Sequence, residues 1–391
     1  MKILHVTNFF KPSWEAGGVA RVAYEISENL VNEGHEVTVY TTDGFKSRLN
    51  VEKNTPIIID GMKIYYFRNL LNYLTKSNLP IPYYVPLIAR SQMQDFDIIH
   101  IHEHRTFLAI IVHFYAKKYR TPYILQSHGS VTPFFKKKTF KILFDHFFGY
   151  KILRDASKVI ALTKTEANQY EMMGVSKNKI EIIPNGINLS EYNNLPKKGK
   201  FKTKYMIPMS NKVILYLGRL HESKGLDLIL DSFSDVHKEL HNIKLVFVGP
   251  DDGYQESLTA RAKKLDVSDN IIFAGYVDNI TKIEAFVDAT VFITPSYSGF
   301  PVTFLEACAC GTPIITTTNG DILEWINDKV GYVVEYDKDQ LKNAMFRILS
   351  DENLRAKFKI ECSNLMVNDF EWAKIVKKLE NLYRINRRIS T

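Results

Sequence analysis

The chain has 391 residues, of which 45% are hydrophobic and 24% are charged. This length predicts two domains, and the composition is that of a folded globular protein and excludes a disordered chain. The net charge of +8 predicts an anionic partner, which is a nucleotide, a phospholipid headgroup or a nucleic acid.

The chain contains no apolar run of the ~18 residues that a membrane-spanning helix needs, and its first residues are typical of a strand and not of a signal peptide. We therefore expect a cytoplasmic protein. The three cysteines, Cys308, Cys310 and Cys362, form neither a disulfide framework nor a CxxC pair, so a structural zinc site is not expected.

Strands alternate with helices along the first half of the chain, which predicts a parallel sheet built from βαβ units. Strands are expected at 2–7, 36–41, 57–59, 63–67, 98–101, 123–127, 158–162 and 180–183. The clearest helix covers 19–32, because apolar residues from Val19 to Leu30 recur at helical spacing.

A second α/β series follows the polar, basic stretch 195–202, which we interpret as an interdomain linker. Its strands are expected at 213–217, 244–248, 271–274, 291–294, 313–316 and 331–334, and its helices at 224–240, 255–265, 281–286, 302–310, 321–327 and 339–349. The predicted domains are therefore 1–196 and 204–371. Two α/β domains of similar size that face each other imply a ligand cleft between them.

The loop after the first strand contains Gly17 and Gly18 and leads into the first helix. Glycines at this place allow backbone N–H groups at a helix N-terminus to meet a phosphate. The loop lacks the GxGxxG pattern, which disfavours a nicotinamide or flavin cofactor. An ordinary glycine turn is the alternative.

In the second half, a strand is followed by Gly218, Arg219 and Lys224. Two cations that flank a turn at the carboxyl edge of a sheet are suited to bind a diphosphate and to neutralise a leaving nucleotide in place of a metal ion. The alternative is a pair of solvated surface cations.

Residues 294–316 form a strand end, a turn, a short helix and another strand, and Glu306 is the one acid in this segment. The helix begins at the carboxyl edge of a sheet, where open α/β folds bind ligands. Its first N–H groups favour an anion such as a nucleotide phosphate, and its carboxylate suits a sugar hydroxyl.

His128 follows an apolar strand, which makes it a candidate site residue, although a lone loop histidine is most often structural. His100, His102 and His104 alternate along another strand, so we expect all three on one face. No carboxylate or cysteine motif completes a metal site there, and we do not expect one. Glu103 points the other way and is an alternative cleft residue.

Residues 134–154 mix lysines with phenylalanines, a pattern typical of an interfacial helix that binds a membrane surface. A core helix with a solvated basic face is the alternative.

These motifs together resemble the retaining glycosyltransferases of family four, which are nucleotide-sugar-dependent enzymes with the GT-B fold of two Rossmann-like domains. The resemblance covers nearly the whole chain. It rests on ordered motifs at 17–21, 183–187, 218–225, 248–250, 273–276 and 299–313.

The resemblance implies that Arg219 and Lys224 bind the donor diphosphate, that Glu306 binds the ribose and that His128 contacts the donor sugar near the reacting centre. The base would lie near Tyr276 and Val277. The other donor-binding residues that it implies are Gly17, Gly18, Asn185, Gly218, Ser298, Gly299, Phe300, Pro301, Val302, Thr303 and Phe304. The C-terminal helix, 372–391, is expected to pack back on the N-terminal domain.

One position departs from the family pattern, because Ser298 stands where relatives usually carry a second glutamate. In relatives that acid typically touches the transferred sugar, and serine offers a hydrogen bond without charge. Losing one charged contact is worth roughly 1.5–3 kcal/mol, enough to shift the donor preference.

The expected function is a metal-independent, retaining transfer of a hexose from a nucleoside diphosphate sugar to a hydroxyl acceptor, with no cofactor and no nucleic-acid partner. The segment 134–154 suggests that this acceptor is a lipid-linked or membrane-bound glycan. Peripheral binding to the inner face of the cell membrane is a further expectation. A non-catalytic sugar-nucleotide-binding member of the same fold is the alternative. A nucleotide-sugar epimerase is disfavoured.

Overall fold

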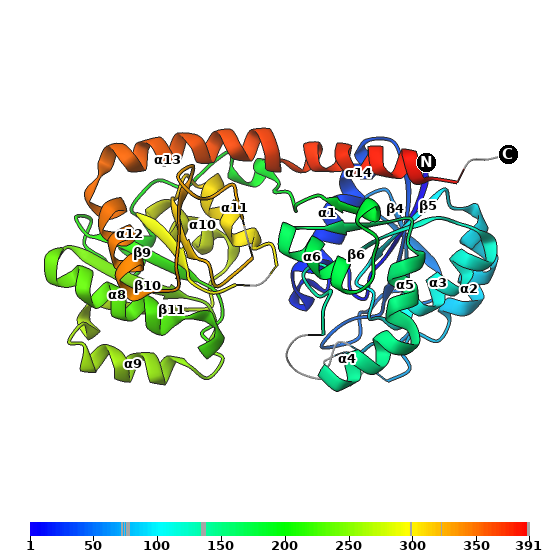
Figure 1. Cartoon of the computed structure of the whole chain (residues 1–391), viewed down its shortest axis with the longest axis horizontal. Helices are drawn as coiled ribbons and strands as arrows, with labels where there is room; N and C mark the ends of the chain where they lie inside the picture. The colour runs from blue at the N-terminus through cyan, green and yellow to red at the C-terminus, as the bar shows by residue number, and fades with distance from the viewer. Residues whose placement is uncertain are drawn as a thin grey trace. The chain divides into compact units, whose positions relative to one another are not determined.

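The computed structural model describes residues 1–71, 73, 75, 79–133, 138–297, 299–321 and 323–388. The chain divides into two compact units, Met1–Asn185 with Trp372–Thr391 and Gly186–Glu371. Each unit is an α/β fold with one sheet and helices packed against it (Figure 1). The predicted α/β class with parallel sheets is confirmed.

The first unit contains an eight-stranded sheet in the order β3-β4-β2-β1-β5-β6-β7-β8. Its strands are β1 (Lys2–Val6), β2 (Glu36–Thr42), β3 (Pro56–Ile59), β4 (Met62–Phe67), β5 (Ile98–His102), β6 (Tyr123–Gln126), β7 (Lys158–Ala161) and β8 (Ile180–Ile182). Only β3 and β4 pair antiparallel among these strands. The reason is local, because Asp60 and Gly61 between them have φ of 50° and 75°, as a two-residue hairpin turn requires.

Alternate residues of these strands point to opposite faces, so the sheet separates two hydrophobic cores. Leu4 packs in the core formed with α2 and α3, whereas Ile3 packs in the core formed with α1 and α14. The helices of this unit are α1 (Gly18–Asn32), α2 (Val85–Gln92), α3 (Phe107–Tyr119), α4 (Lys138–Phe144), α5 (Tyr150–Asp155), α6 (Lys164–Met172) and α14 (Trp372–Asn386).

Helix α14 belongs to the first unit although it comes last in the chain (Figure 1). Its buried residues recur at helical spacing and form one apolar stripe. They are Trp372, Ile375, Val376, Leu379, Leu382 and Tyr383. This stripe packs with α1 against the sheet.

The second unit contains a six-stranded parallel sheet in the order β11-β10-β9-β12-β13-β14. Its strands are β9 (Lys212–Leu217), β10 (Ile243–Val248), β11 (Ile271–Gly275), β12 (Val291–Thr294), β13 (Ile314–Thr317) and β14 (Gly331–Val334). Its helices are α7 (Lys200–Lys204), α8 (Leu226–Glu239), α9 (Gln255–Lys264), α10 (Asn279–Asp288), α11 (Val302–Ala309), α12 (Lys338–Ser350) and α13 (Glu352–Leu365). The strand order reverses between β9 and β12, where such sheets bind ligands beyond the strand ends.

Two stretches differ from the sequence prediction. Residues 195–202 lie within the second unit, because the backbone N–H of Lys202 donates to Asp288 Oδ2 at 2.9 Å and its ammonium donates to the Asn211 carbonyl at 2.7 Å. In the described part of 321–327 a turn replaces the predicted helix, and Trp325 packs against Phe370 with 5.0 Å between ring centroids. In both stretches contacts with residues far along the chain decide the structure.

Among the helices in the described ranges, none has both the length and the hydropathy needed to cross a lipid bilayer.

Candidate functional site

The turn after β9 holds Arg219 and Lys224 close enough for their charges to interact. Burial, and next the charge of Arg219, hold the pKa of the Lys224 ammonium below its ordinary value. Arg219 is 63% exposed, and its Nη1 lies 2.6 Å from Asp252 Oδ2. In the described part of the chain no carboxylate pairs with Lys224. Two neighbouring cations of this kind favour the binding of an anion.

This turn is fixed by close backbone contacts with the turn after β10. The Gly218 N–H donates to the Val248 carbonyl at 2.9 Å, and the Leu220 N–H donates to the Pro250 carbonyl at 3.0 Å. A Cβ at Gly249, where φ is 136°, would lie 2.0 Å from the Gly218 carbonyl oxygen. Glycine at 249 therefore permits the approach that holds Arg219 in place.

Helix α11 begins at the switch point of the second sheet with open backbone donors. Its N-cap is Pro301, and within the described ranges no side chain caps this end of the helix. The N–H groups of Val302 and Thr303 therefore lie at the positive end of the helix, where an anion is favoured. The Phe304 N–H is taken, because it donates to the Pro301 carbonyl at 3.1 Å.

Two aromatic residues near this helix belong to the core. Phe304 is fully buried, and its ring lies 5.8 Å from that of Phe292. Phe300 is 8% exposed and packs against Trp325. The rings of these two residues are therefore not available to a ligand. Gly299 has a φ of 72°, and Ser298 lies outside the described residues.

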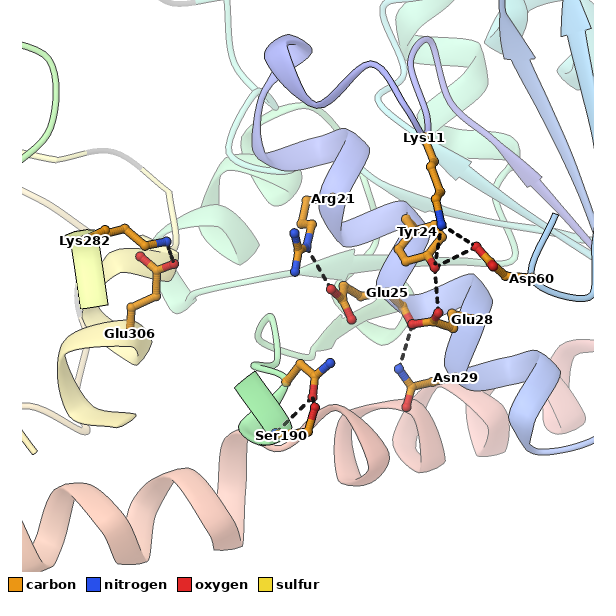
Figure 2. A network of polar contacts seen from close by, with 11 residues as sticks. Lys11, Arg21, Tyr24, Glu25, Glu28, Asn29, Asp60, Ser190, Lys282 and Glu306 are labelled. Carbon is orange, nitrogen blue, oxygen red and sulfur yellow. Dashed lines mark hydrogen bonds and ion pairs between the residues drawn. The ribbon is translucent and has the colours of Figure 1, made fainter. Parts of the chain in front are cut away.

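Glu306 on α11 forms an ion pair with Lys282 on α10 (Figure 2). Both side chains are largely buried, at 14% and 22% exposed. The ammonium therefore fixes one carboxylate oxygen of Glu306. Sequence reasoning missed Lys282, because no spacing pattern links two residues on different helices.

Tyr276 and Val277 follow the end of β11 at Gly275. The Tyr276 side chain is 81% exposed, whereas Val277 is half-buried. An exposed ring at a strand end offers a flat surface on which a base can stack.

In the first unit, helix α1 begins at Gly18 with Gly17 as its N-cap, and both glycines are exposed. A Cβ at either position would meet nothing within 4 Å. Since no side chain caps the helix in the described ranges and no acid lies in its first turn, this end also favours an anion. Figure 2 shows the side chains of Lys11 and Asp60 beside Tyr24, which lies on this helix. The Lys11 ammonium and the Asp60 carboxylate form an ion pair at 2.6 Å.

The loop that carries His128 follows β6 and is held by α6. Glu166 accepts hydrogen bonds from the N–H groups of Gly129 and Leu162, each at 2.7 Å. The Ser127 N–H donates to the Tyr170 hydroxyl at 2.9 Å. His128 itself has a φ of 52°, which a non-glycine residue rarely adopts without such support.

The predicted alignment of His100, His102 and His104 is wrong, because β5 ends at His102 and Glu103 turns the backbone with a φ of 67°. His104 Nδ1 lies 3.0 Å from the Ser127 hydroxyl instead. The third ring beside His100 and His102 is that of His5 on β1. Each of these three histidines has a ring nitrogen that lies within 4.8 Å of a ring nitrogen of the other two.

Hydrogen bonds and stacking account for this arrangement. The rings of His100 and His102 stack at 4.2 Å, and His100 Nδ1 lies 2.6 Å from the Tyr383 hydroxyl. Burial holds the pKa of His5 at about 3, and burial also raises the pKa of Glu103 to about 7. Burial also lowers the pKa of His100 and His102, so all three rings are neutral near pH 7 and act as hydrogen-bond donors and acceptors.

Asn185 is the last residue of the first unit. Its side chain is 5% exposed, and Oδ1 has no hydrogen-bond partner in the described ranges.

Two family models match consecutive parts of the chain. The model described as Glycosyltransferase Family 4 matches residues 16–191, and the model described as Glycosyl transferases group 1 matches residues 197–362. The chain belongs to the family 4-like glycosyltransferases. An uncharacterized glycosyltransferase of Methanocaldococcus jannaschii is 27% identical to it over 98% of each chain.

Two further proteins resemble this glycosyltransferase over most of its length. Phosphatidyl-myo-inositol mannosyltransferase of Mycolicibacterium smegmatis is 24% identical over 94% of this chain and 90% of its own. The crystal structure of Anabaena HepE in complex with UDP and glucose covers 98% of this chain and 100% of its own at a TM-score of 0.74 and 15% identity. This likeness confirms the GT-B fold.

Within the second unit, three of the predicted residues follow the two strands of the sheet's switch point, whereas Tyr276 and Val277 follow β11 at the edge of the sheet. Arg219 and Lys224 follow β9, and Glu306 lies on the helix that follows β12, the neighbour of β9. Sequence reasoning missed the partners of these residues, Asp252 and Lys282, and it also missed His5. Asp252 alone left a signal, because it follows the apolar strand next to β9.

Proposed function

We propose that this glycosyltransferase moves a hexosyl unit from a nucleoside diphosphate sugar to a hydroxyl acceptor, with retention of configuration and without a metal ion. The observation that carries the proposal is the pair Arg219 and Lys224. Both cations lie at one turn of the sheet's switch point, and burial together with the charge of Arg219 lowers the pKa of Lys224. A bound diphosphate relieves this repulsion.

The leaving group determines what these two residues do in the reaction. As the bond between the anomeric carbon and the phosphate oxygen breaks, negative charge grows on the diphosphate, and Arg219 and Lys224 stabilise it. The acceptor oxygen bonds to the anomeric carbon on the face that the diphosphate leaves. The departing phosphate oxygen takes the acceptor's proton, so no protein nucleophile is needed.

The nucleotide is proposed to bind along the same edge of the second unit. The open N–H groups at the start of α11 suit a phosphate, Glu306 suits the ribose hydroxyls and the exposed ring of Tyr276 suits the base. Binding of UDP by HepE, which has the same fold, is consistent with this assignment. In the first unit, Gly18 is assigned to a phosphate and His128 to the sugar.

Nucleotide release from a panel of nucleoside diphosphate sugars tests the proposal, with chelator present throughout. We expect turnover of at least one donor, and a loss of at least about 100-fold for Arg219→Ala. Arg261→Ala is the matched control, because Arg261 also pairs with an aspartate at 2.6 Å in the same unit. Turnover that needs an added metal would refute metal independence. Donor binding without turnover would favour the non-catalytic alternative.

A lipid-linked acceptor, reached at a membrane surface, is supported by the exposed rings on α4, α5 and the residues between them. The exposed aromatic residues are Phe140, Phe147, Phe148 and Tyr150, at 64%, 56%, 42% and 48%. A core helix would bury such rings. Lys138 and Lys151 are exposed on the same segment, and the likeness to a phosphatidyl-myo-inositol mannosyltransferase points the same way. Residues 134–137 of the predicted interfacial segment lie outside the described residues.

Co-sedimentation with vesicles that contain anionic lipid tests this surface. Phe147→Ser with Phe148→Ser is expected to lower the bound fraction at least about threefold. Ile360→Ser is the matched control, because this residue is 61% exposed on α13 of the second unit. Equal binding by the wild type and all variants would show that Phe147 and Phe148 do not contact the membrane. It would refute this surface as the place where a lipid-linked acceptor is reached.

A further inference from the structure

The ring of His128 is joined to two histidines that lie deeper in the first unit. His102 Nδ1 lies 2.9 Å from His128 Nε2, and His5 Nδ1 lies 3.0 Å from His102 Nε2. His5 and His102 are 0% and 1% exposed. Because β1, β5 and β6 are neighbours in the sheet, the three rings form a line from the core to the loop after β6.

Only two arrangements of protons satisfy both hydrogen bonds when all three rings are neutral. In one, His5 donates to His102 and His102 donates to His128. In the other, every donor is reversed, and His5 carries its proton on Nε2. That Nε2 is buried and has no partner in the described ranges. A buried N–H without an acceptor is rarer than an unused lone pair, so we assign the first arrangement.

This arrangement determines which nitrogen of His128 carries the proton. Since Nε2 accepts from His102, the proton of neutral His128 lies on Nδ1. In the described part of the chain Nδ1 has no partner, so it is available as a donor. Burial lowers the pKa of His128 to about 3, which keeps the ring neutral near pH 7.

The orientation of the His128 ring also depends on His102. The hydrogen bonds from Glu166 and Tyr170 on α6 hold the backbone of the loop, through Gly129 and Ser127. The ring is stacked on that of His102, with 5.2 Å between centroids and 13° between planes. Its hydrogen bond and its stacking partner therefore come from the same residue.

We propose that His102 is a positioning residue, which donates from Nδ1 to His128 and thereby keeps the Nδ1–H of His128 directed to a hydroxyl oxygen of the donor sugar. This inference rests on the proposed function, in which His128 contacts the sugar. It adds a residue that no part of the sequence pattern had assigned to the reaction.

The tautomer of His128 is measured without any turnover. In protein labelled with ¹⁵N-histidine, two-bond ¹⁵N–¹H correlations distinguish Nδ1–H from Nε2–H, and spectra of His128→Gln assign the signal. We expect Nδ1–H in the wild type and a change to the Nε2–H form, which a free neutral imidazole prefers, in His102→Phe. His128 with Nε2–H in the wild type, or no change in His102→Phe, would overturn the proposal.

Kinetics test whether this positioning affects the reaction. His102→Phe is expected to lower kcat/KM for the donor about 10- to 100-fold, and His102→Gln, whose amide both donates and accepts, is expected to recover part of it. His100→Phe is the matched control, because His100 is equally buried on the same strand but bonds to Tyr383. It is expected to stay within about threefold of wild type.

The outcomes separate this inference from the proposed function. An active wild type with equal rates for folded His102→Phe and His100→Phe would refute the positioning role alone. A wild type that releases nucleotide from no donor would refute the proposed function. Even then, the tautomer of His128 would show whether His102 donates a hydrogen bond to His128.

Discussion

Acidification is expected to destabilise the first unit through its buried histidines. His5 is fully buried, and burial lowers its pKa to about 3, compared with 6.5 for the unperturbed side chain. The unfolded chain therefore binds a proton near pH 5 that the folded chain does not bind. The folded pKa is depressed, so this contribution to stability is fully present above pH 6.5 and is lost as pH falls below 6.5.

The magnitude follows from these two pKa values. Between about pH 7.5 and about pH 5.0, His5 alone lowers the free energy of unfolding by about 2 kcal/mol. Glu103 acts in the opposite direction, because its pKa is raised to about 7 and its folded form binds the extra proton. The total change with pH therefore mixes both signs, and the contribution of His5 has to be obtained from a variant that lacks only this imidazole.

Hydrogen exchange of the slow amides in β1 and β5 reports on this unit alone. Between the two pH values, the free energy of unfolding of His5→Gln is expected to fall by about 2 kcal/mol less than that of the wild type, after correction for intrinsic exchange rates. His146→Gln is the matched control, because this histidine is exposed in the same unit. Equal pH dependence in His5→Gln and wild type would refute the reasoning, since it would mean that His5 does not titrate between folded and unfolded states.

Three further predictions concern the second unit. Because the pKa of Lys224 is lowered, its ammonium should lose its proton below the ordinary lysine pKa, and the KM for the donor should then rise. In Lys224→Arg, which keeps its charge, this rise in KM should be absent up to about pH 10. Equal pH profiles of KM in variant and wild type would contradict the proposed binding of the diphosphate by Lys224. Lys282→Met should raise the donor KM about 3- to 10-fold by releasing Glu306, with a smaller change in kcat; an unchanged KM would argue against the ribose assignment. Gly249→Ala should lower the free energy of unfolding, measured by heat or denaturant, by about 2 kcal/mol or more. Gly253→Ala, whose Cβ would meet nothing within 4 Å, should lower it by about 1 kcal/mol. Equal losses would contradict the close contact between Gly249 and the Gly218 carbonyl.

The fold was largely predictable because its signals are local. Apolar strands and amphipathic helices recur along both halves, and helices expected at 224–240 and 339–349 form at Leu226–Glu239 and Lys338–Ser350. The stretch 321–327 has similar apolar spacing, but Trp325 finds its partners in Phe300 and Phe370, which no local pattern records.

Of the site, only the residues proposed to contact the ligand were predictable from the sequence. Arg219, Lys224 and His128 follow apolar strands, and this position alone marks them as candidates. Their partners are set by the tertiary structure: His5 reaches His102 across 97 positions of sequence. The backbone of Glu103 turned His104 away from the expected face, because a positive φ at a non-glycine residue leaves little trace in sequence.

Helix α14 has a consequence for how the protein is made. Its stripe completes a core whose other members are in the first half of the chain, so the ribosome must first synthesise all of Gly186–Glu371. At translation rates of about 5–20 residues per second, the apolar face of α1 waits on the order of 10–40 seconds for its partner. During that interval the nascent first unit presents an uncovered apolar surface, which is the kind of surface that chaperones bind.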